Sequence, residues 1–171
     1  RNIDEVDELK RLSIETSHPL WMVKMLSKQY GLEVTKKICF HDNMPPVRAA
    51  RVNTLKINRE ELLKDSTFKK GNLALDAVLY EAGNIADTEY FKNGSVTIQD
   101  ESSQLVAPLL NPQKNELILD MCCAPGSKTA HLAALMENSG KIIAYDLFEH
   151  KIKLVNDNLV RLGITNVELH V

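Results

Sequence analysis

The sequence predicts an α/β protein in which N-terminal helices and a small α+β module precede the first half of a doubly wound parallel sheet. Apolar residues recur at helical spacing over the first 45 residues, and short strand-like runs between turn residues follow. From Glu116 onward, apolar strand-like runs alternate with helical stretches, which is typical of right-handed βαβ units. We therefore expect a helical segment or linker, a docking module and a sheet region, at 1–45, 46–100 and 101–171.

Three helices are expected in the N-terminal region. One apolar stripe near the start of the chain consists of Ile3, Val6, Leu9 and Leu12. A second helix is expected over 17–31, with Pro19 in its first turn and Gly31 at its C-terminal end. A third is expected over 32–43, where two prolines follow it. The side chains of the second helix that are expected to pack into the protein core are Trp21, Met22, Met25 and Leu26.

The middle region reads as a β-α-β-β run. Strands are expected at 47–53, 73–81 and 95–100. Asn58 is placed to cap a short helix over 59–65, because acidic residues occupy its first turn. A further helix is expected over 101–110, ended by an asparagine-proline pair.

The C-terminal region carries the pattern of a buried parallel sheet. Its strands are expected at 117–121, 141–146 and 167–171, and its helices at 128–138 and 149–163. The strand runs are mostly apolar, as expected for strands covered on both faces.

Composition narrows the class of protein. The chain has 171 residues, 44% hydrophobic and 26% charged, which is ordinary for a soluble globular protein. No apolar stretch reaches the roughly 18 residues of a membrane span. Three cysteines make a disulfide framework unlikely, so we expect a reducing cytoplasm and no membrane partner. The chain begins with Arg1 rather than methionine, which we interpret as an excised or processed chain.

Positive charge is concentrated in one stretch although the net charge is −2. Residues 36–70 hold nine Lys or Arg against four acids, a local balance of +5. Either an ordinary solvated surface or a patch that faces nucleic-acid phosphates would have this composition. The candidates for such phosphate contacts are Arg48, Arg51, Lys56 and Arg59.

The stretch "LILDMCCAPGSKT" (117–129) allows four readings. A metal site is disfavoured, and none is expected, because Cys122 and Cys123 are adjacent whereas zinc ligands are usually separated by two to four residues. A nucleotide P-loop requires glycine before the lysine, where Ser127 stands. A cysteine nucleophile would benefit from the following helix N-terminus, but no base is evident.

The fourth reading is a loop that binds a nucleoside cofactor. In doubly wound sheets, ligands lie beyond the carboxyl ends of the strands, at the first strand-to-helix turn. Asp146 ends the next strand, close to the ~20-residue spacing at which an acid holds a ribose. A tight turn with a capping aspartate is the remaining alternative.

In addition to the spacing between the loop and Asp146, several sequence motifs resemble those of a known family. "DMCCAPGSKTAHLA" (120–133) resembles the cofactor motif D-x-C-A-A-P-G-G-K-T of the NOL1/NOP2/Sun family of RNA cytosine-5 methyltransferases. "TIQDESSQLVAPLLNPQ" (97–113) is similar to the segment that precedes this motif. Two further stretches, 18–31 and 45–64, are similar to the upstream region of the family. The resemblance covers nearly the whole chain and is closest to the bacterial Sun branch.

This resemblance implies a Rossmann-like class I methyltransferase sheet and S-adenosylmethionine as the cofactor. The residues that it implies around the methionine and adenosine are Cys122, Cys123, Ala124, Pro125, Gly126, Ser127 and Lys128, with Asp146 on the ribose. Cys123 replaces the usual alanine, and Ser127 the usual second glycine. Serine would be strained there if the position required a positive φ.

The implied reaction is methylation of cytosine C5 in ribosomal RNA of the small subunit (16S). In the family, a cysteine thiolate adds to C6 and makes C5 nucleophilic. The family's cysteines lie in Thr-Cys and Pro-Cys motifs, which this sequence lacks. We therefore assign no catalytic residue in this chain, and we expect it to be inactive alone and to self-associate through an unpaired strand edge at 117–121. A non-catalytic RNA-binding module with a vestigial loop and a small-molecule methyltransferase are the alternatives.

Overall fold

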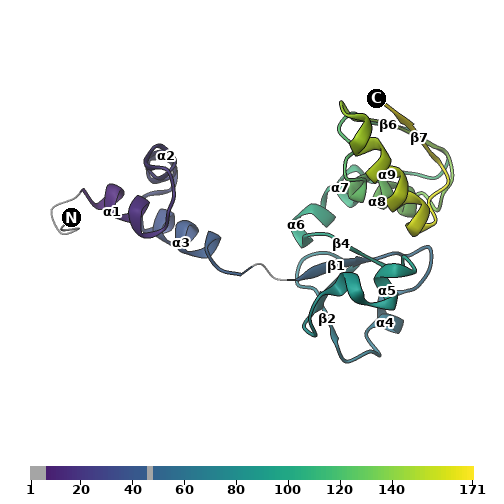
Figure 1. Cartoon of the computed structure of the whole chain (residues 1–171), viewed down its shortest axis with the longest axis horizontal. Helices are drawn as coiled ribbons and strands as arrows, with labels where there is room; N and C mark the ends of the chain where they lie inside the picture. Colours follow the sequence, from purple (N-terminus) through teal and green to yellow (C-terminus); the bar gives the residue numbers. More distant parts are fainter. Residues whose placement is uncertain (1–6, 46–47) are drawn as a thin grey trace. The chain divides into compact units, whose positions relative to one another are not determined.

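A computed structural model describes residues 7–45 and 48–171, which form two compact units. The predicted α/β class is confirmed: the first unit is helical, and the second contains an antiparallel and a parallel sheet (Figure 1). Ile3 and Val6 of the predicted stripe lie outside the described residues, as does Val47 of the predicted first strand. In the described ranges, no helix has both the length and the apolar character needed to cross a membrane.

The first unit packs three helices around a small core. They are α1 (Glu8–Glu15), α2 (Leu20–Tyr30) and α3 (Leu32–Asp42). Val23 is fully buried, whereas Trp21 and Met25 are 67% and 50% exposed, so the prediction that these two are core residues was wrong. Trp21 and Met25 are four residues apart and share one face of α2. Val23 is two residues from each, ~200° around the helix, and that face packs against Leu12 and Cys39.

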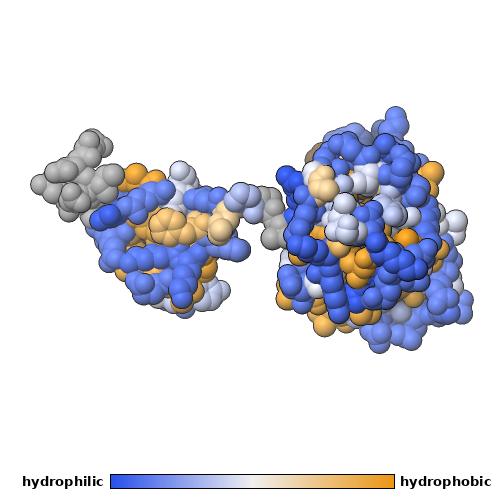
Figure 2. All heavy atoms as spheres, turned by 90° about the horizontal axis from the view of Figure 1, so that it is seen from below, coloured by the Kyte–Doolittle hydropathy of each residue, from blue (hydrophilic) through white to orange (hydrophobic). Residues whose placement is uncertain are grey.

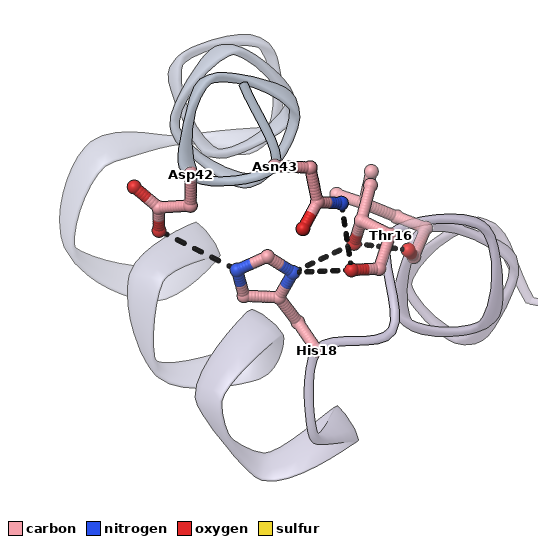
Figure 3. A network of polar contacts seen from close by, with 5 residues as sticks. Thr16, His18, Asp42 and Asn43 are labelled. Carbon is pink, nitrogen blue, oxygen red and sulfur yellow. Dashed lines mark hydrogen bonds and ion pairs between the residues drawn. The ribbon is translucent and has the colours of Figure 1, made fainter. Parts of the chain in front are cut away.

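Polar contacts tie the junction of α1 and α2 to the end of α3 (Figure 3). The carbonyl of Thr16 lies 2.8 Å from Nδ1 of His18 and accepts a 2.9 Å hydrogen bond from Nδ2 of Asn43. The other ring nitrogen of His18 lies 3.4 Å from the carboxylate of Asp42. These contacts join the turn between α1 and α2 to the C-terminal end of α3.

The second unit begins with a four-stranded antiparallel sheet in the order β2-β3-β1-β4. Its strands are β1 (Ala49–Val52), β2 (Phe68–Lys70), β3 (Ala77–Tyr80) and β4 (Val96–Ile98). Its helices are α4 (Arg59–Leu62), the 3-10 turn η2 (Ile85–Asp87) and α5 (Glu89–Lys92). Asn58 caps α4 as predicted, since its side chain accepts a 2.8 Å hydrogen bond from the Glu61 N–H. The prediction missed β2, a three-residue strand with two lysines.

Alternation along β1 divides the sheet into two faces. Ala50 and Val52 enter a core that also contains Leu62, Phe68 and Val78. The residues between them, Ala49 and Arg51, therefore project from the opposite face.

Two short helices lead from this sheet to the next, α6 (Glu101–Gln104) and α7 (Val106–Leu110). A single helix was predicted here. The break has a local reason, because Pro108 has no N–H to donate to the carbonyl of Gln104. Asn111 ends α7 in the left-handed conformation.

The parallel sheet has the order β5-β6-β7. Its elements are β5 (Leu117–Asp120), α8 (Ser127–Leu135), β6 (Lys141–Tyr145), α9 (Glu149–Leu162) and β7 (Val167–His170). The expectation of buried strands fails at both edges of the sheet, since neither β5 nor β7 contains a buried residue. In β5, Leu117 and Leu119 are exposed by 69% and 58%. Hydrophobic residues also reach the surface of both units among hydrophilic ones (Figure 2).

Candidate cofactor site

The loop between β5 and α8 is fixed at both ends by one carboxylate. Asp120 is the last residue of β5, and its Oδ1 accepts a 3.2 Å hydrogen bond from the N–H of Cys122. Its Oδ2 accepts a 2.7 Å hydrogen bond from the hydroxyl of Thr129, in the first turn of α8. The loop therefore turns tightly over the carboxyl end of its strand.

Asp146 lies against this loop. It follows β6 directly, and its Oδ2 accepts a 3.2 Å hydrogen bond from the N–H of Ala124. The preceding N–H, of Cys123, donates to the carbonyl of Tyr145 at 2.9 Å. The Asp146 side chain is 10% exposed, with Nζ of Lys151 at 3.8 Å. The structure thus brings together the loop and Asp146, as predicted, although Ala124 and Asp146 are 22 residues apart in the sequence.

Glycine occupies the one loop position that needs it. Gly126 has a φ of +94°, and a Cβ added there would meet Cγ1 of Val155 at 3.1 Å. Ser127 is the first residue of α8 and is not among the residues with positive φ. The strain considered for serine at this position is therefore absent, because the left-handed residue is its neighbour.

No side chain caps the N-terminus of α8, because its N-cap residue is Gly126. The first N–H groups of any α-helix lack a partner within the helix, and the helix dipole makes this end attractive to polar and anionic groups.

The carbonyl groups of the loop are held from two other elements. The Pro125 carbonyl accepts a 2.9 Å hydrogen bond from Nδ2 of Asn158 in α9. The Ser127 carbonyl accepts one of 3.2 Å from Nη2 of Arg51 in β1. Sequence reasoning missed Asn158, since nothing distinguishes it from the other polar residues of an amphipathic helix.

The two loop cysteines differ in environment. Cys122 is exposed, whereas Cys123 is 4% exposed. Burial, together with the nearby carboxylates of Asp120 and Asp146, raises the pKa of the Cys123 thiol to about 11. Cys123 therefore stays protonated at neutral pH, which is unsuited to a nucleophile. Across 7–45 and 48–171, no three His, Cys, Asp or Glu side chains gather as a metal would require.

Lys128 is exposed beside the loop. It borders an apolar pocket of about 320 Å³ whose other lining residues are Val106, Ala107, Leu109, Leu110 and Leu132. This pocket lies between α7 and α8, next to the open end of α8.

The cations proposed for RNA contact have different surroundings. Arg48 is exposed and donates to the Gly83 carbonyl at 2.6 Å. Lys56 is also exposed, but its Nζ donates to the carbonyls of Asn93 and Arg161 at 2.6 and 2.8 Å.

The two remaining arginines are less accessible. The Arg59 side chain is 12% exposed and lies 3.4 Å from Glu60. Arg51 is 2% exposed, so its guanidinium has almost no surface to offer a phosphate. The basic stretch 36–70 is moreover divided between the two units.

Two family models match the chain. Residues 107–171 match the model described as 16S rRNA methyltransferase RsmB/F. Residues 18–69 match the ferredoxin-like domain of RsmF/B-like methyltransferases. The first match contains the whole candidate loop together with Asp146.

Proteins with similar sequences are also named as ribosomal RNA methyltransferases. The chain is 48% identical, over 93% of its length and 37% of the relative's, to a probable ribosomal RNA small subunit methyltransferase B of Bacillus subtilis. It is 34% identical, over 92% of its length and 20% of the relative's, to a human 28S rRNA (cytosine(4447)-C(5))-methyltransferase. The chain thus spans well under half the length of these relatives.

The fold is also similar to that of a solved methyltransferase structure. A methyltransferase homologue from Pyrococcus horikoshii superposes with a TM-score of 0.86 and 31% identity, covering 96% of this chain and 56% of that one. The expectation of a Rossmann-like methyltransferase sheet is thereby confirmed. With its loop motif, its parallel sheet and these relatives, the chain belongs to the Sun/RsmB family of ribosomal RNA methyltransferases.

Proposed function

We propose that this chain carries the S-adenosylmethionine-binding part of a ribosomal RNA cytosine-5 methyltransferase. The observation that carries the proposal is the 3.2 Å hydrogen bond between the Ala124 N–H and the Asp146 carboxylate. It places an acid that can hold a ribose directly beside a glycine-containing loop at a helix N-terminus, where nucleoside cofactors bind in doubly wound sheets.

The loop residues fit such a cofactor. Asp146 Oδ2 has one hydrogen bond from Ala124, and a carboxylate has about four acceptor sites, so it can also accept from two ribose hydroxyls. Small side chains and the uncapped start of α8 leave main-chain groups accessible to the methionine and adenosine. In this role we propose Cys122, Cys123, Ala124, Pro125, Gly126, Ser127 and Lys128. The cofactor itself would supply an electrophilic methyl group.

The substrate follows from the family. The Bacillus and human relatives are named as ribosomal RNA methyltransferases, the human one for the C5 position of a cytosine. We propose the same substrate class here, with small-subunit (16S) RNA as the specific target. In this division, residues 46–100 dock RNA, with Arg48 and Lys56 as the exposed ones among the proposed contacts, and residues 101–171 hold the cofactor.

Catalysis by this chain alone is not part of the proposal. No cysteine in it follows a threonine or a proline, as the family's nucleophile and helper do. The high pKa of Cys123 gives a further reason not to assign that residue as the nucleophile. We propose that the 171-residue chain binds cofactor without transferring its methyl group.

Calorimetry with S-adenosylmethionine tests this function. The wild-type chain should bind, and Asp146→Ala should bind at least tenfold more weakly, because two hydrogen bonds to a charged acceptor are lost. Asp157→Asn, an exposed acid on α9, is the matched control and should bind like the wild type. Methyl transfer to ribosomal RNA by the chain alone would contradict the division of roles. RNA binding without any cofactor binding would favour a non-catalytic RNA module.

A further inference from the structure

Arg51 projects from the antiparallel sheet toward the parallel one. Its neighbours in β1, Ala50 and Val52, belong to the core beneath the sheet, so Arg51 lies on the other face. It pairs with Thr97 across the sheet, and Thr97 is itself 6% exposed. This second face is therefore also covered, and α6 contacts both β1 and α8 on that side.

Arg51 carries a buried charge. Its side chain is 2% exposed, and burial lowers its pKa to about 10, so it is still protonated at neutral pH. Within 7–45 and 48–171 no carboxylate lies within ion-pair distance of it, and Asp76 acts on it only at longer range. Its guanidinium donates from Nη2 to the carbonyl of Ser127. Charge-assisted hydrogen bonds of this kind are among the stronger ones in a protein interior.

The acceptor of this hydrogen bond, Ser127, lies where the loop meets α8. It begins α8 and follows Gly126, the left-handed residue of the loop. In the described part of the chain, the other side chains that hydrogen-bond to the loop backbone come from the parallel-sheet region itself: Asp120, Asp146 and Asn158. Arg51 is the contact that reaches the loop from the proposed docking module, across 76 residues of sequence.

We propose that Arg51 is a positioning residue of the cofactor loop. By fixing the Ser127 carbonyl, it sets the direction of the first turn of α8 and hence of the N–H groups that face the cofactor. It thereby couples the antiparallel sheet to cofactor binding. This role rests on the proposed function, and it replaces the RNA contact first considered for Arg51.

Two substitutions and one control test the proposal in the 171-residue chain. Arg51→Met removes the donor but keeps an unbranched side chain, and Arg51→Lys keeps a charge and a donor. Lys70→Met, the control, removes an exposed positive charge from β2 of the same sheet. Calorimetry gives the dissociation constant for S-adenosylmethionine, at a temperature where circular dichroism shows each variant folded. Hydrogen exchange of peptides covering 122–131 reports on the loop without ligand.

Arg51→Met should weaken cofactor binding about tenfold, the effect of one charge-assisted hydrogen bond, and should speed exchange in the loop. Arg51→Lys should recover part of both, and Lys70→Met should match the wild type. Wild-type affinity in a folded Arg51→Met variant, even one with a lower melting temperature, would overturn the proposal, since the role would then be structural only. If Arg51→Met does not fold, unchanged affinity and exchange in Arg51→Lys would overturn it equally. Absence of binding by the wild type would instead refute the proposed function, and this role with it.

Discussion

The hydroxyl of Thr129 donates a 2.7 Å hydrogen bond to Oδ2 of Asp120, and so closes the loop between β5 and α8 onto the strand from which it starts. Thr129 is fully buried, and the other oxygen of the same carboxylate accepts the N–H of Cys122. One side chain at the end of β5 thus holds both the entry to the loop and the first turn of the following helix.

Thr129→Val should destabilise the fold. The substitution preserves the shape of the side chain but leaves one oxygen of Asp120 without its donor, so we expect the free energy of unfolding to fall by about 1–3 kcal/mol. Urea denaturation measures this. Thr54→Val, at an exposed position, is the control and should stay within about 0.5 kcal/mol of wild type. Equal midpoints for the two variants would count against the Asp120 contact.

His131 should make stability depend on pH. It is 3% exposed, and neither ring nitrogen has a hydrogen-bond partner in the described part of the chain. Burial, with a contribution from Arg51, lowers its pKa from 6.5 to about 3. Between these values the unfolded chain binds a proton that the folded chain does not, so stability is lost as pH falls from 6.5 toward 3.

The matched variants isolate this effect from that of the carboxylates. His131→Leu should flatten the pH dependence of the unfolding free energy within that window, and His150→Leu, an exposed histidine on α9, should leave it unchanged. Parallel curves for wild type and His131→Leu between pH 4 and 7 would show that folding does not shift the pKa of His131.

The free edge of β5 should promote self-association. Leu117 and Leu119 are exposed on a strand that ends the sheet, and an exposed apolar edge strand is a template for pairing with another chain. Sedimentation velocity of the wild type should show mass rising with concentration, and Leu119→Lys should shift it toward monomer. Val160→Lys, an equally apolar exposed position on α9, should not. A wild-type chain that stays monomeric at high concentration would argue that the edge is protected.

Arg48 should contribute to RNA affinity through charge alone. Arg48→Gln should weaken binding to ribosomal RNA fragments regardless of sequence, and should reduce the slope of log affinity against log salt by about 0.7–1. Lys92→Gln, an exposed lysine on α5 that pairs with Glu89, provides the comparison. An unchanged salt slope for Arg48→Gln would place the RNA elsewhere.

Much of the fold was predictable because it follows from local patterns. Apolar periodicity located the three helices of the first unit and the βαβ alternation of the second, and the Asn58 cap was visible from residue type alone. The short elements were not predictable. Strand β2 forms because Phe68 enters the core beside Val78. A three-residue sequence is too short to predict such a tertiary contact. The same holds for α2, whose buried face centres on Val23 rather than on its largest side chain.

In the candidate site, too, local sequence patterns were predictable and tertiary contacts were not. The loop and Asp146 were found from the sequence because the motif is contiguous and the acid ends the next strand. Asn158 and Arg51 reach the loop from elements 33 and 76 residues away, and no spacing rule connects them to it. Arg51 lies in the basic stretch 36–70, whose composition indicated a contact with phosphates at the surface. The burial of Arg51 does not allow such a contact.

The anchoring of this loop bears on how a ligand would meet it. Its backbone groups are secured by the residues that end β5 and follow β6 on one side, and by side chains of β1 and α9 on the other. A segment already held in one shape loses little conformational entropy when it is occupied. Such preorganisation predicts fast, lock-and-key association, with affinity set by the partner groups in place rather than by refolding of the loop.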